Sequence, residues 1–287
     1  MSTVFTPYPL VAALQKTEDF LGAQREWNVV NRTQTRFLRE SFEPCRQEVT
    51  QIKEIESVAS YSEEVINRFL RERDFTIQLR PFPPAGFGTA SVLDLNVVWQ
   101  ERGRRTKVRT VGELTFPGIY LEEGVEFLES RKVREPVVKL ATKSNDAVYI
   151  MRWDHPLSEF DLVSTVSDLS LEAADVWYEG VIFPMVDLDL SINTEWLIGL
   201  NTQDENGAVA IISQALQQTK FKMNEFGARV KSAAAVGVMR GGPIPYIINS
   251  PFLLWIERAG LSKPLFVGHI TQENWRDPGL FRNFLPK

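Results

Sequence analysis

The first third of the chain carries apolar residues at helical spacing. They recur three and four positions apart at residues 10–14 and again at residues 65–70, as expected for helices with one buried face. Ser60 and Glu63 have the spacing of a capping box, in which two side chains bond to backbone N–H groups where a helix begins. This pattern predicts helices between residue 10 and about residue 74.

The pattern changes after a cluster of proline and glycine at residues 80–88. Because such residues end regular structure, the sequence predicts a helical N-terminal region, residues 1–85, and a β-rich region, residues 86–287, within one compact domain. Apolar and polar residues alternate in the second region, which is typical of strands. Strands are predicted at residues 92–99, 125–128, 137–140, 148–153, 181–190, 219–226, 244–257 and 265–270. Helices followed by many strands predict an α+β fold.

The composition is typical of a globular protein. Of 287 residues, 44% are hydrophobic and 24% are charged, and the net charge of -5 gives no general attraction to nucleic acid or anionic lipid. No apolar run has the roughly 18 residues that a membrane-spanning helix needs, and residues 1–9 lack the cationic start of a secretory signal. The single cysteine, Cys45, cannot form an internal disulfide. We therefore expect an intracellular, cytoplasmic protein that contacts no membrane.

Few side chains are candidates for catalysis. The two histidines, His155 and His269, exclude a histidine-rich metal site within one chain, and no nucleophile elbow or phosphate-binding loop is present. A nucleophilic pair of Cys45 with a histidine is a weaker hypothesis than an ordinary, partly buried thiol. Asp187 and Asp189 share one face of a predicted strand, where a solvated face is favoured over acid–base chemistry. The sequence predicts no enzyme activity, no metal and no cofactor.

One short run of the sequence is strongly cationic. Its charges would contact the phosphates of a nucleic acid, and the nearby Trp99 would stack on a base. More often such a run lies at the exposed end of a hairpin, where its charges protect a sheet edge from unwanted pairing. The run comprises Arg102, Arg104, Arg105, Lys107 and Arg109.

Three short motifs follow one another in the last part of the chain. They are Asn-Glu-x-Gly at residues 224–227, Pro-Phe-Leu at 251–253 and Leu-Phe-x-Gly at 265–268, with an alanine-rich segment at 232–237 after the first. In this order and spacing they resemble the C-terminal half of the serpin family. The resemblance extends mainly over residues 118–270.

The resemblance implies serpin-like mixed sheets with an N-terminal helical region, in a divergent and shortened form. It also implies a reactive loop, which a protease cleaves and which then inserts into the main sheet as an additional strand. Counting back from the second motif places the cleavage site at Arg240-Gly241, just after Met239. Arginine at this position favours a serine protease of the trypsin type, which has an acidic specificity pocket.

Insertion requires small or apolar residues at every second position, because these face the core. The set that begins at Ala228 meets this requirement, whereas Arg229 and Lys231 fall in the other set. Two features are less typical of inhibitory serpins: Ala228 and Arg229 stand where threonine and acidic residues are usual, and Val230 is bulky. The implied hinge residues are Glu225, Gly227, Ala228, Val230, Ser232 and Ala234.

Three hypotheses about function follow. The first is a suicide-substrate inhibitor of a trypsin-like serine protease, acting through the loop around Arg240-Gly241. The second is a non-inhibitory protein with the same fold, which serves in assembly or binds another protein through its N-terminal helices. The third is a nucleic-acid-binding protein that uses the basic run at residues 102–109. The expected partner is therefore a protein, either a protease or an assembly partner, and nucleic acid is less favoured.

Overall fold

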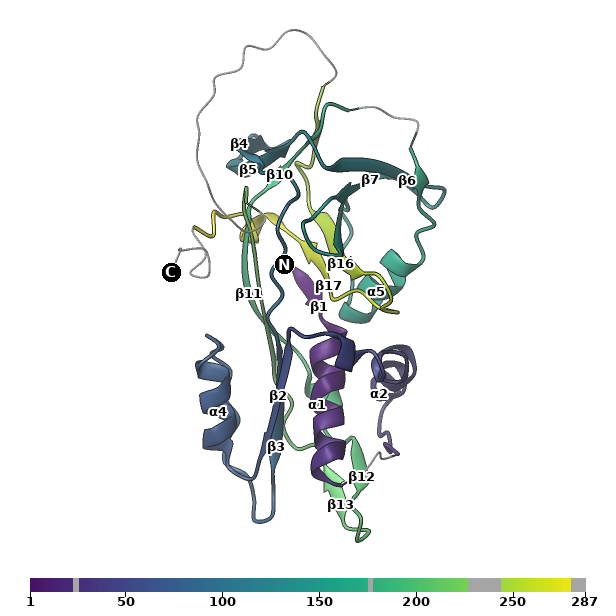
Figure 1. Ribbon diagram of the computed structural model, residues 1–287, viewed down its shortest axis with the longest axis vertical. Coiled ribbons are helices and arrows are strands. Elements are labelled where there is room, and N and C mark those ends of the chain that lie inside the picture. Colours follow the sequence, from purple (N-terminus) through teal and green to yellow (C-terminus); the bar gives the residue numbers. More distant parts are fainter. Residues whose placement is uncertain (23–25, 175–177, 227–243, 280–287) are drawn as a thin grey trace.

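The computed structural model describes residues 1–22, 26–174, 178–226 and 244–279. The molecule is elongated, with several helices and two hairpins in its lower half and the larger sheets in its upper half (Figure 1). The helices are α1 (Pro7–Phe20), α2 (Arg32–Phe37), α3 (Glu43–Cys45), α4 (Glu63–Arg71) and α5 (Glu159–Ser167). Shorter helical turns are the π-helix Leu38–Phe42 and the 3-10 turns Val49–Gln51, Glu195–Leu197 and Gln272–Asn274. Among the described helices, none is long and apolar enough to cross a bilayer.

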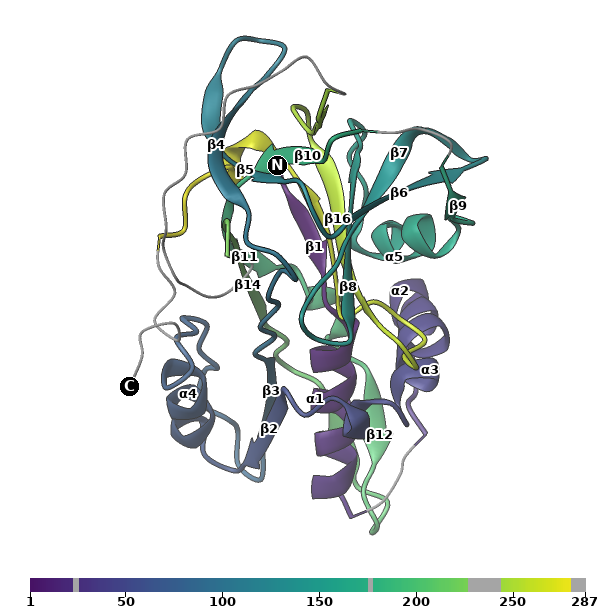
Figure 2. The ribbon, with the colours of Figure 1, turned by 45° about the horizontal axis from the view of Figure 1, so that its top comes forward.

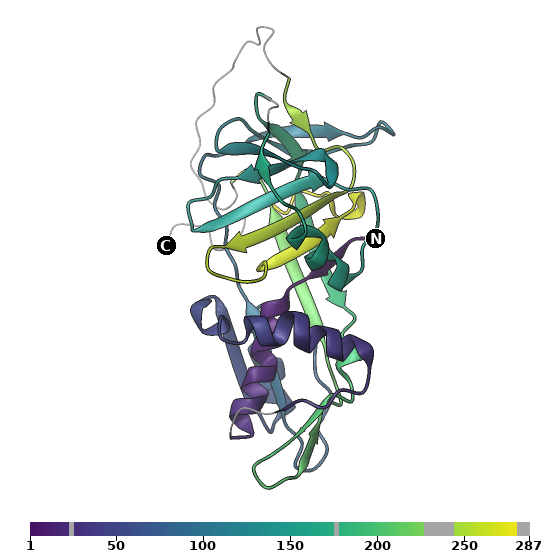
Figure 3. The same ribbon diagram turned by 90° about the vertical axis from the view of Figure 1, so that its right-hand side faces the viewer.

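A seven-stranded antiparallel sheet forms the centre of the core. Its strands lie in the order β1 (Thr3–Phe5), β17 (Phe266–Ile270), β16 (Phe252–Arg258), β8 (Asp146–Arg152), β7 (Val133–Leu140), β6 (Val125–Ser130) and β9 (Glu172–Ala173). Residues 252–256 of β16 are all buried, because this continuous apolar run is covered on both faces. β1 leads directly into α1 (Figure 3).

A second sheet has four strands, and its strand β4 (Arg104–Arg109) lies on the side away from β6 and β7 (Figure 2). Its edge strand is the one that carries most of the basic run, so these charges protect a sheet edge, as the favoured interpretation expected. The strand at the opposite edge is only two residues long and runs parallel to its single neighbour. The order is β15 (Tyr246–Ile247), β10 (Val181–Pro184), β5 (Thr115–Leu121) and β4 (Arg104–Arg109).

The remaining strands form three separate two-stranded ribbons. α1 and α4 cover opposite sides of the first ribbon (Figure 1), and Ile66 and Leu70 of α4 pack against Ala90 and Val92. In the second ribbon, buried and outward-facing residues alternate at 186–189, as the sequence predicted. The ribbons pair β2 (Ile55–Ser60) with β3 (Gly88–Leu93), β11 (Val186–Ile192) with β14 (Gln217–Met223), and β12 (Asn201–Gln203) with β13 (Val209–Ile211).

The α+β prediction is confirmed, but its helical N-terminal part needs two corrections. Residues 55–60 form strand β2, because they pair with β3 along their whole length. The predicted capping box is also wrong: Ser62 is the residue that precedes α4, and the Ser60 hydroxyl accepts a hydrogen bond from the Ser62 backbone N–H. Through β1 and β2, backbone hydrogen bonds join the predicted N-terminal region to the predicted β-rich region.

Candidate functional site

A cavity of about 890 Å³ lies between β3 and β14, and we call it the slot. β3 pairs only with β2, and β14 pairs only with β11, so each strand has one edge without a strand partner in the described part of the chain. α1 lines the slot from one side through Leu10 and Leu14, and residues 95–97 and Trp99 extend its wall beyond β3. The two unpaired edges make the slot a place where another strand would fit.

Two hydrogen bonds close the slot at the end where β14 finishes. The Trp99 Nε1–H donates to the Asn224 carbonyl oxygen over 3.1 Å, and the Gly103 N–H donates to the Glu225 carbonyl oxygen over 2.8 Å. The Glu225 carboxylate is buried, and its Oε1 lies 2.9 Å from Arg105 Nε. Its Oε2 has no hydrogen-bond partner. Glu225, a predicted hinge residue, therefore lies in a hydrogen-bonded junction at this end of the slot.

A single extended segment covers the slot on the side opposite α1. Its residues Phe75, Ile77 and Leu79 line the cavity. Two glutamines, one in β14 and one shortly before it, hold the segment: Gln218 Oε1 accepts from the Thr76 N–H over 2.8 Å, and Gln214 Oε1 accepts from the Arg80 N–H over 2.8 Å. These bonds come from glutamine side chains and not from the backbone of β14. The extended segment therefore covers the slot without pairing with β14 as a strand.

The strand that follows the predicted loop is tethered to the large sheet. The Tyr246 hydroxyl donates to Glu135 Oε2 over 2.6 Å, and the Arg152 Nε–H donates to the Tyr246 oxygen over 2.9 Å. Burial and the Glu135 contact raise the pKa of Tyr246, so the neutral hydroxyl persists at physiological pH. This contact fixes β15, which has only two paired residues of its own.

Most of the predicted loop lies outside the described residues. Glu225, the first of the predicted hinge residues, is described, and its side chain is buried. On the far side of the loop, Ile244 is exposed and Tyr246 is buried. The predicted residues outside the described part are Gly227, Ala228, Val230, Ser232, Ala234, Met239, Arg240 and Gly241.

The basic run has acidic partners that its local sequence does not indicate. Arg102 stacks over the ring of Phe226 at 4.2 Å, and Lys107 is exposed. Since the carboxylates compensate much of the charge, the run presents a weaker attraction to phosphate than its sequence implied. The ion pairs join Arg104 to Glu122, Arg105 to Glu225 and Asp277, and Arg109 to Glu113.

The weaker catalytic candidates do not come together. His269 is buried and bonds through Nε2 to a backbone carbonyl, while His155 is exposed. Asp187 and Asp189 face lysines across β11 and β14, which confirms the solvated strand face. Within the described residues, no group of three or more histidine, cysteine or acidic side chains is arranged to hold a metal ion.

Cys45 is expected to be chemically inert in the folded protein. It is fully buried, and burial raises the pKa of its thiol to about 11, so the reactive thiolate is scarce near neutral pH. We expect iodoacetamide at pH 8 to leave Cys45 unmodified in native protein and to alkylate it fully in urea, as measured by mass spectrometry. Rapid alkylation of the native protein would contradict this burial.

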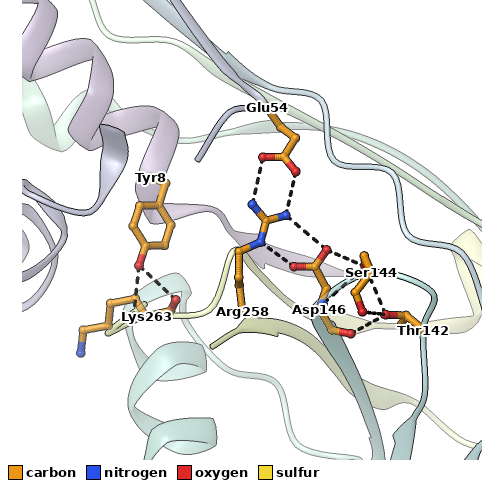
Figure 4. A network of polar contacts seen from close by, with 7 residues as sticks. All are labelled: Tyr8, Glu54, Thr142, Ser144, Asp146, Arg258 and Lys263. Atoms are coloured by element: carbon orange, nitrogen blue, oxygen red, sulfur yellow. Dashed lines mark hydrogen bonds and ion pairs between the residues drawn. The ribbon is translucent and has the colours of Figure 1, made fainter. Parts of the chain in front are cut away.

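A polar network that the sequence did not indicate joins the two halves of the molecule (Figure 4). Arg258, at the end of β16, bonds to both carboxylate oxygens of Glu54 over 2.8 and 2.9 Å, and its Nε lies 2.7 Å from Asp146 Oδ1. These residues are 204 and 112 positions from Arg258. No local pattern could have brought them together.

Comparison with solved structures gives matches over nearly the whole chain. Thyroxine-binding globulin, solved in complex with thyroxine, matches with a TM-score of 0.60 at 13% identity, covering 96% of this chain and 93% of that chain. Human kallistatin gives 0.58 at 13% identity, covering 97% and 92%. Serpin48 of the insect Tenebrio molitor gives 0.55 at 14% identity, covering 94% and 92%.

The matches therefore extend well beyond residues 118–270, on which most of the sequence resemblance depends. No family model matches the sequence, and no curated protein matches it either. At this low identity a structural likeness establishes the fold rather than the activity. The arrangement of sheets around the slot and the structural matches lead to one conclusion: the chain has the serpin fold.

Proposed function

We propose that the protein inhibits a trypsin-like serine protease as a suicide substrate, by inserting the residues that follow Phe226 into the slot. The slot itself is the observation that carries this proposal. It offers two strand edges without strand partners, and it begins beside the end of β14. The fold is that of a group of proteins that typically act as inhibitors or binding proteins rather than as enzymes.

Insertion would stabilise the protein through backbone pairing on both sides. Each new backbone hydrogen bond contributes about 1 kcal/mol, and a strand between β3 and β14 would form several on each edge. In an inserted strand, the alternating set Ala228, Val230, Ser232 and Ala234 would place uncharged residues of small to medium size toward the apolar slot. Arg229 and Lys231 would then face the outer side, so no charge would be buried.

The attachment of the two loop ends supports a requirement for cleavage. One end continues from the junction at Glu225, and the other enters β15, which Tyr246 tethers to the large sheet. While both ends are held, the intervening residues cannot extend fully along β14. Attack of the protease serine on the Arg240 carbonyl breaks the bond to Gly241, whose amine leaves with a proton, and Arg240 remains esterified to the protease. The freed segment would then insert and carry the protease with it.

This function is tested by incubating the protein with trypsin. We expect a covalent complex that resists sodium dodecyl sulfate, with cleavage after Arg240. About 10 kcal/mol of added stability would raise the unfolding temperature of the cleaved protein by about 20 °C. Cleavage with neither a complex nor a gain in thermal stability would show that the chain is only a substrate.

A matched pair of variants tests the insertion step alone. Ala234→Asp places a carboxylate toward the slot, so we expect cleavage without a covalent complex. Ala233→Asp places the same group on the outer side and should still form the complex. Equal behaviour of the two variants would contradict insertion in this register.

A second candidate function is protein binding without inhibition, and one surface favours it. Exposed apolar residues gather where the chain segment before α2 bridges to β12 through Asn28 and Asn201. Val30 and Ile211 are each 61% exposed, which is unusual for large apolar side chains grouped together. If this surface binds a partner or a second copy, Val30→Asp with Ile211→Asp should reduce the mass measured by light scattering, whereas Val111→Asp on the distant β4–β5 turn should not. A wild-type protein that is monomeric and captures no partner would exclude this candidate.

A further inference from the structure

We propose that His269 makes the attachment of the N-terminal strand sensitive to acid. When its imidazole gains a proton, β1 separates from β17 and the start of α1 loosens beside the slot. This conformational change goes beyond protease inhibition and does not depend on it.

His269 lies where the N-terminal strand joins the large sheet. Its side chain is 3% exposed, and the residue lies opposite Thr3 of β1 and Leu253 of β16. β1 has three paired residues, and among the described strands β17 is its one neighbour. Because each backbone hydrogen bond contributes only modestly, a change at one of three pairs affects a large part of the attachment of β1.

The neutral ring fits its surroundings, whereas the charged ring does not. Nε2 of His269 lies 3.0 Å from the Trp153 carbonyl oxygen, so in the neutral ring this nitrogen carries the hydrogen. Nδ1 is buried and has no hydrogen-bond partner. A second proton would therefore create a buried N–H donor without an acceptor, which is unfavourable. Burial accordingly lowers the pKa of His269.

The charged groups around the ring do not offset this burial. The Met1 amine also disfavours the charged ring, whereas Asp154 favours it from an exposed position on the loop after β8. Since solvent screens an exposed carboxylate, Asp154 compensates little for a charge placed in the core. The other titratable residues on the segments around β1 and β17 are His155 beside Trp153, Glu159 of α5, Asp161 of α5 paired with Arg36, and Glu273 after β17.

Glu273 also binds the N-terminal strand, but it titrates in a different pH range. Its Oε1 accepts from the Ser2 N–H over 2.6 Å, and this hydrogen bond holds the pKa of Glu273 below its usual value of 4.5. Above pH 5 the Glu273 carboxylate is therefore ionised and its contact with Ser2 persists. A change between about pH 6.5 and pH 5 is then assigned to histidine.

The direction of the pH dependence follows from the lowered pKa of His269. A histidine with a lower pKa in the attached state stabilises that state above its ordinary pKa of 6.5. The stability is lost as the pH falls below 6.5, because the detached strand leaves the ring free to take up a proton. Each pH unit below 6.5 raises the equilibrium constant for detachment by up to about tenfold, until the pKa of the attached state is reached.

Detachment of β1 would also affect the slot through Thr6. This residue lies between β1 and α1, and Gln217 Nε2, at the start of β14, donates to Thr6 Oγ1 over 2.8 Å. α1 in turn lines the slot through Leu10 and Leu14. The N-terminal strand therefore connects His269 to two of the elements that form the slot.

Hydrogen exchange of the intact, uncleaved protein tests the proposal. The peptide that covers residues 2–6 is followed by mass spectrometry at pH 7.5, 6.5 and 5, with correction for the intrinsic exchange rate at each pH. We expect its protection to fall by about tenfold between pH 6.5 and pH 5. Residues 7–14 should lose less protection, and β7 and β8 should lose none.

A matched pair of variants assigns the effect to one histidine. His269→Gln keeps an N–H group for the Trp153 carbonyl oxygen but cannot gain a proton, so the protection of residues 2–6 should no longer depend on pH. His155→Gln changes the exposed neighbour and should behave as the wild type does. Because the chain has two histidines, the proton NMR spectrum of His155→Gln also identifies the imidazole signal of His269. This signal should titrate below pH 6.5, a readout that needs no folded His269→Gln.

Four results would overturn the proposal. Protection of residues 2–6 that is equal at pH 7.5 and pH 5 would do so, as would loss of protection in acid that persists in His269→Gln. Equal loss in β7 and β8 would indicate general acid unfolding, and a His269 signal that titrates at or above pH 6.5 would contradict the burial of the ring. Because no protease is used, the outcome is independent of whether the protein is an inhibitor.

Discussion

Replacing Arg258 with methionine is expected to lower the free energy of unfolding by about 3 to 5 kcal/mol. Removing one partner of a buried ion pair leaves an uncompensated charge, and that cost is of this size. The Asp146 side chain is 2% exposed and the Arg258 side chain 19%, so water cannot easily replace the lost contact. Urea denaturation measures the change. Arg104→Met is the control, because its exposed pair with Glu122 should contribute less than about 1 kcal/mol.

The loss at Arg258 should also depend on pH. The hydrogen bond from Arg258 holds the pKa of Glu54 below its usual value of 4.5. A carboxylate with a lowered pKa stabilises the folded state above its unfolded pKa, and this contribution disappears as the pH falls through the folded pKa. The difference between wild type and Arg258→Met should therefore be constant near neutral pH and narrow below about pH 4.5. A difference that widens in acid would contradict the network.

Gly180→Ala is expected to cost about 4 kcal/mol, the second large effect. Gly180 has a φ of 122°, and a Cβ there would lie 2.3 Å from the Leu121 carbonyl oxygen and 2.8 Å from the Glu122 Cα. Backbone strain and the clash each contribute about 1 to 3 kcal/mol. The Gly180 carbonyl also accepts the Tyr246 N–H over 2.9 Å, so β15 would loosen as well.

The control for this prediction is Gly260→Ala. Gly260 also has a positive φ, of 90°, but nothing lies within 4 Å of its added Cβ. It should lose only the strain of a left-handed residue, about 1 to 2 kcal/mol. Thermal or urea unfolding measures the loss of stability in each variant. Equal losses at the two glycines would mean that the close contact of Gly180 with the end of β5 does not affect stability.

Much of the fold followed from local pattern. The alternation at residues 186–189 predicted an outward and a buried face, and β11 has both. The motif order after residue 181 indicated the serpin-like arrangement that the structural matches support. β2 was missed because residues 55–60 follow a long helical pattern, and only their pairing with β3 defines them as a strand.

The candidate site was less predictable because its parts come from distant segments. The slot lies between β3 and β14, which are more than a hundred residues apart in the sequence. Gln217 is an ordinary polar residue in the sequence. Only the structure shows that its side-chain nitrogen bonds to Thr6 while its side-chain oxygen is buried without a hydrogen-bond partner. The basic run likewise does not indicate Glu225, which pairs with Arg105 although the two residues are far apart in the sequence.

The pairing of β1 with β17 has a consequence for biosynthesis. Thr3 lies opposite His269, and β17 separates β1 from β16 within the seven-stranded sheet. During translation the first strand must therefore wait, without its neighbour, until residues 266–270 have been synthesised and have emerged from the ribosome. Contacts of such long sequence separation slow folding, and partly exposed chains aggregate readily. This protein should consequently depend on chaperones more than a bundle of similar size would.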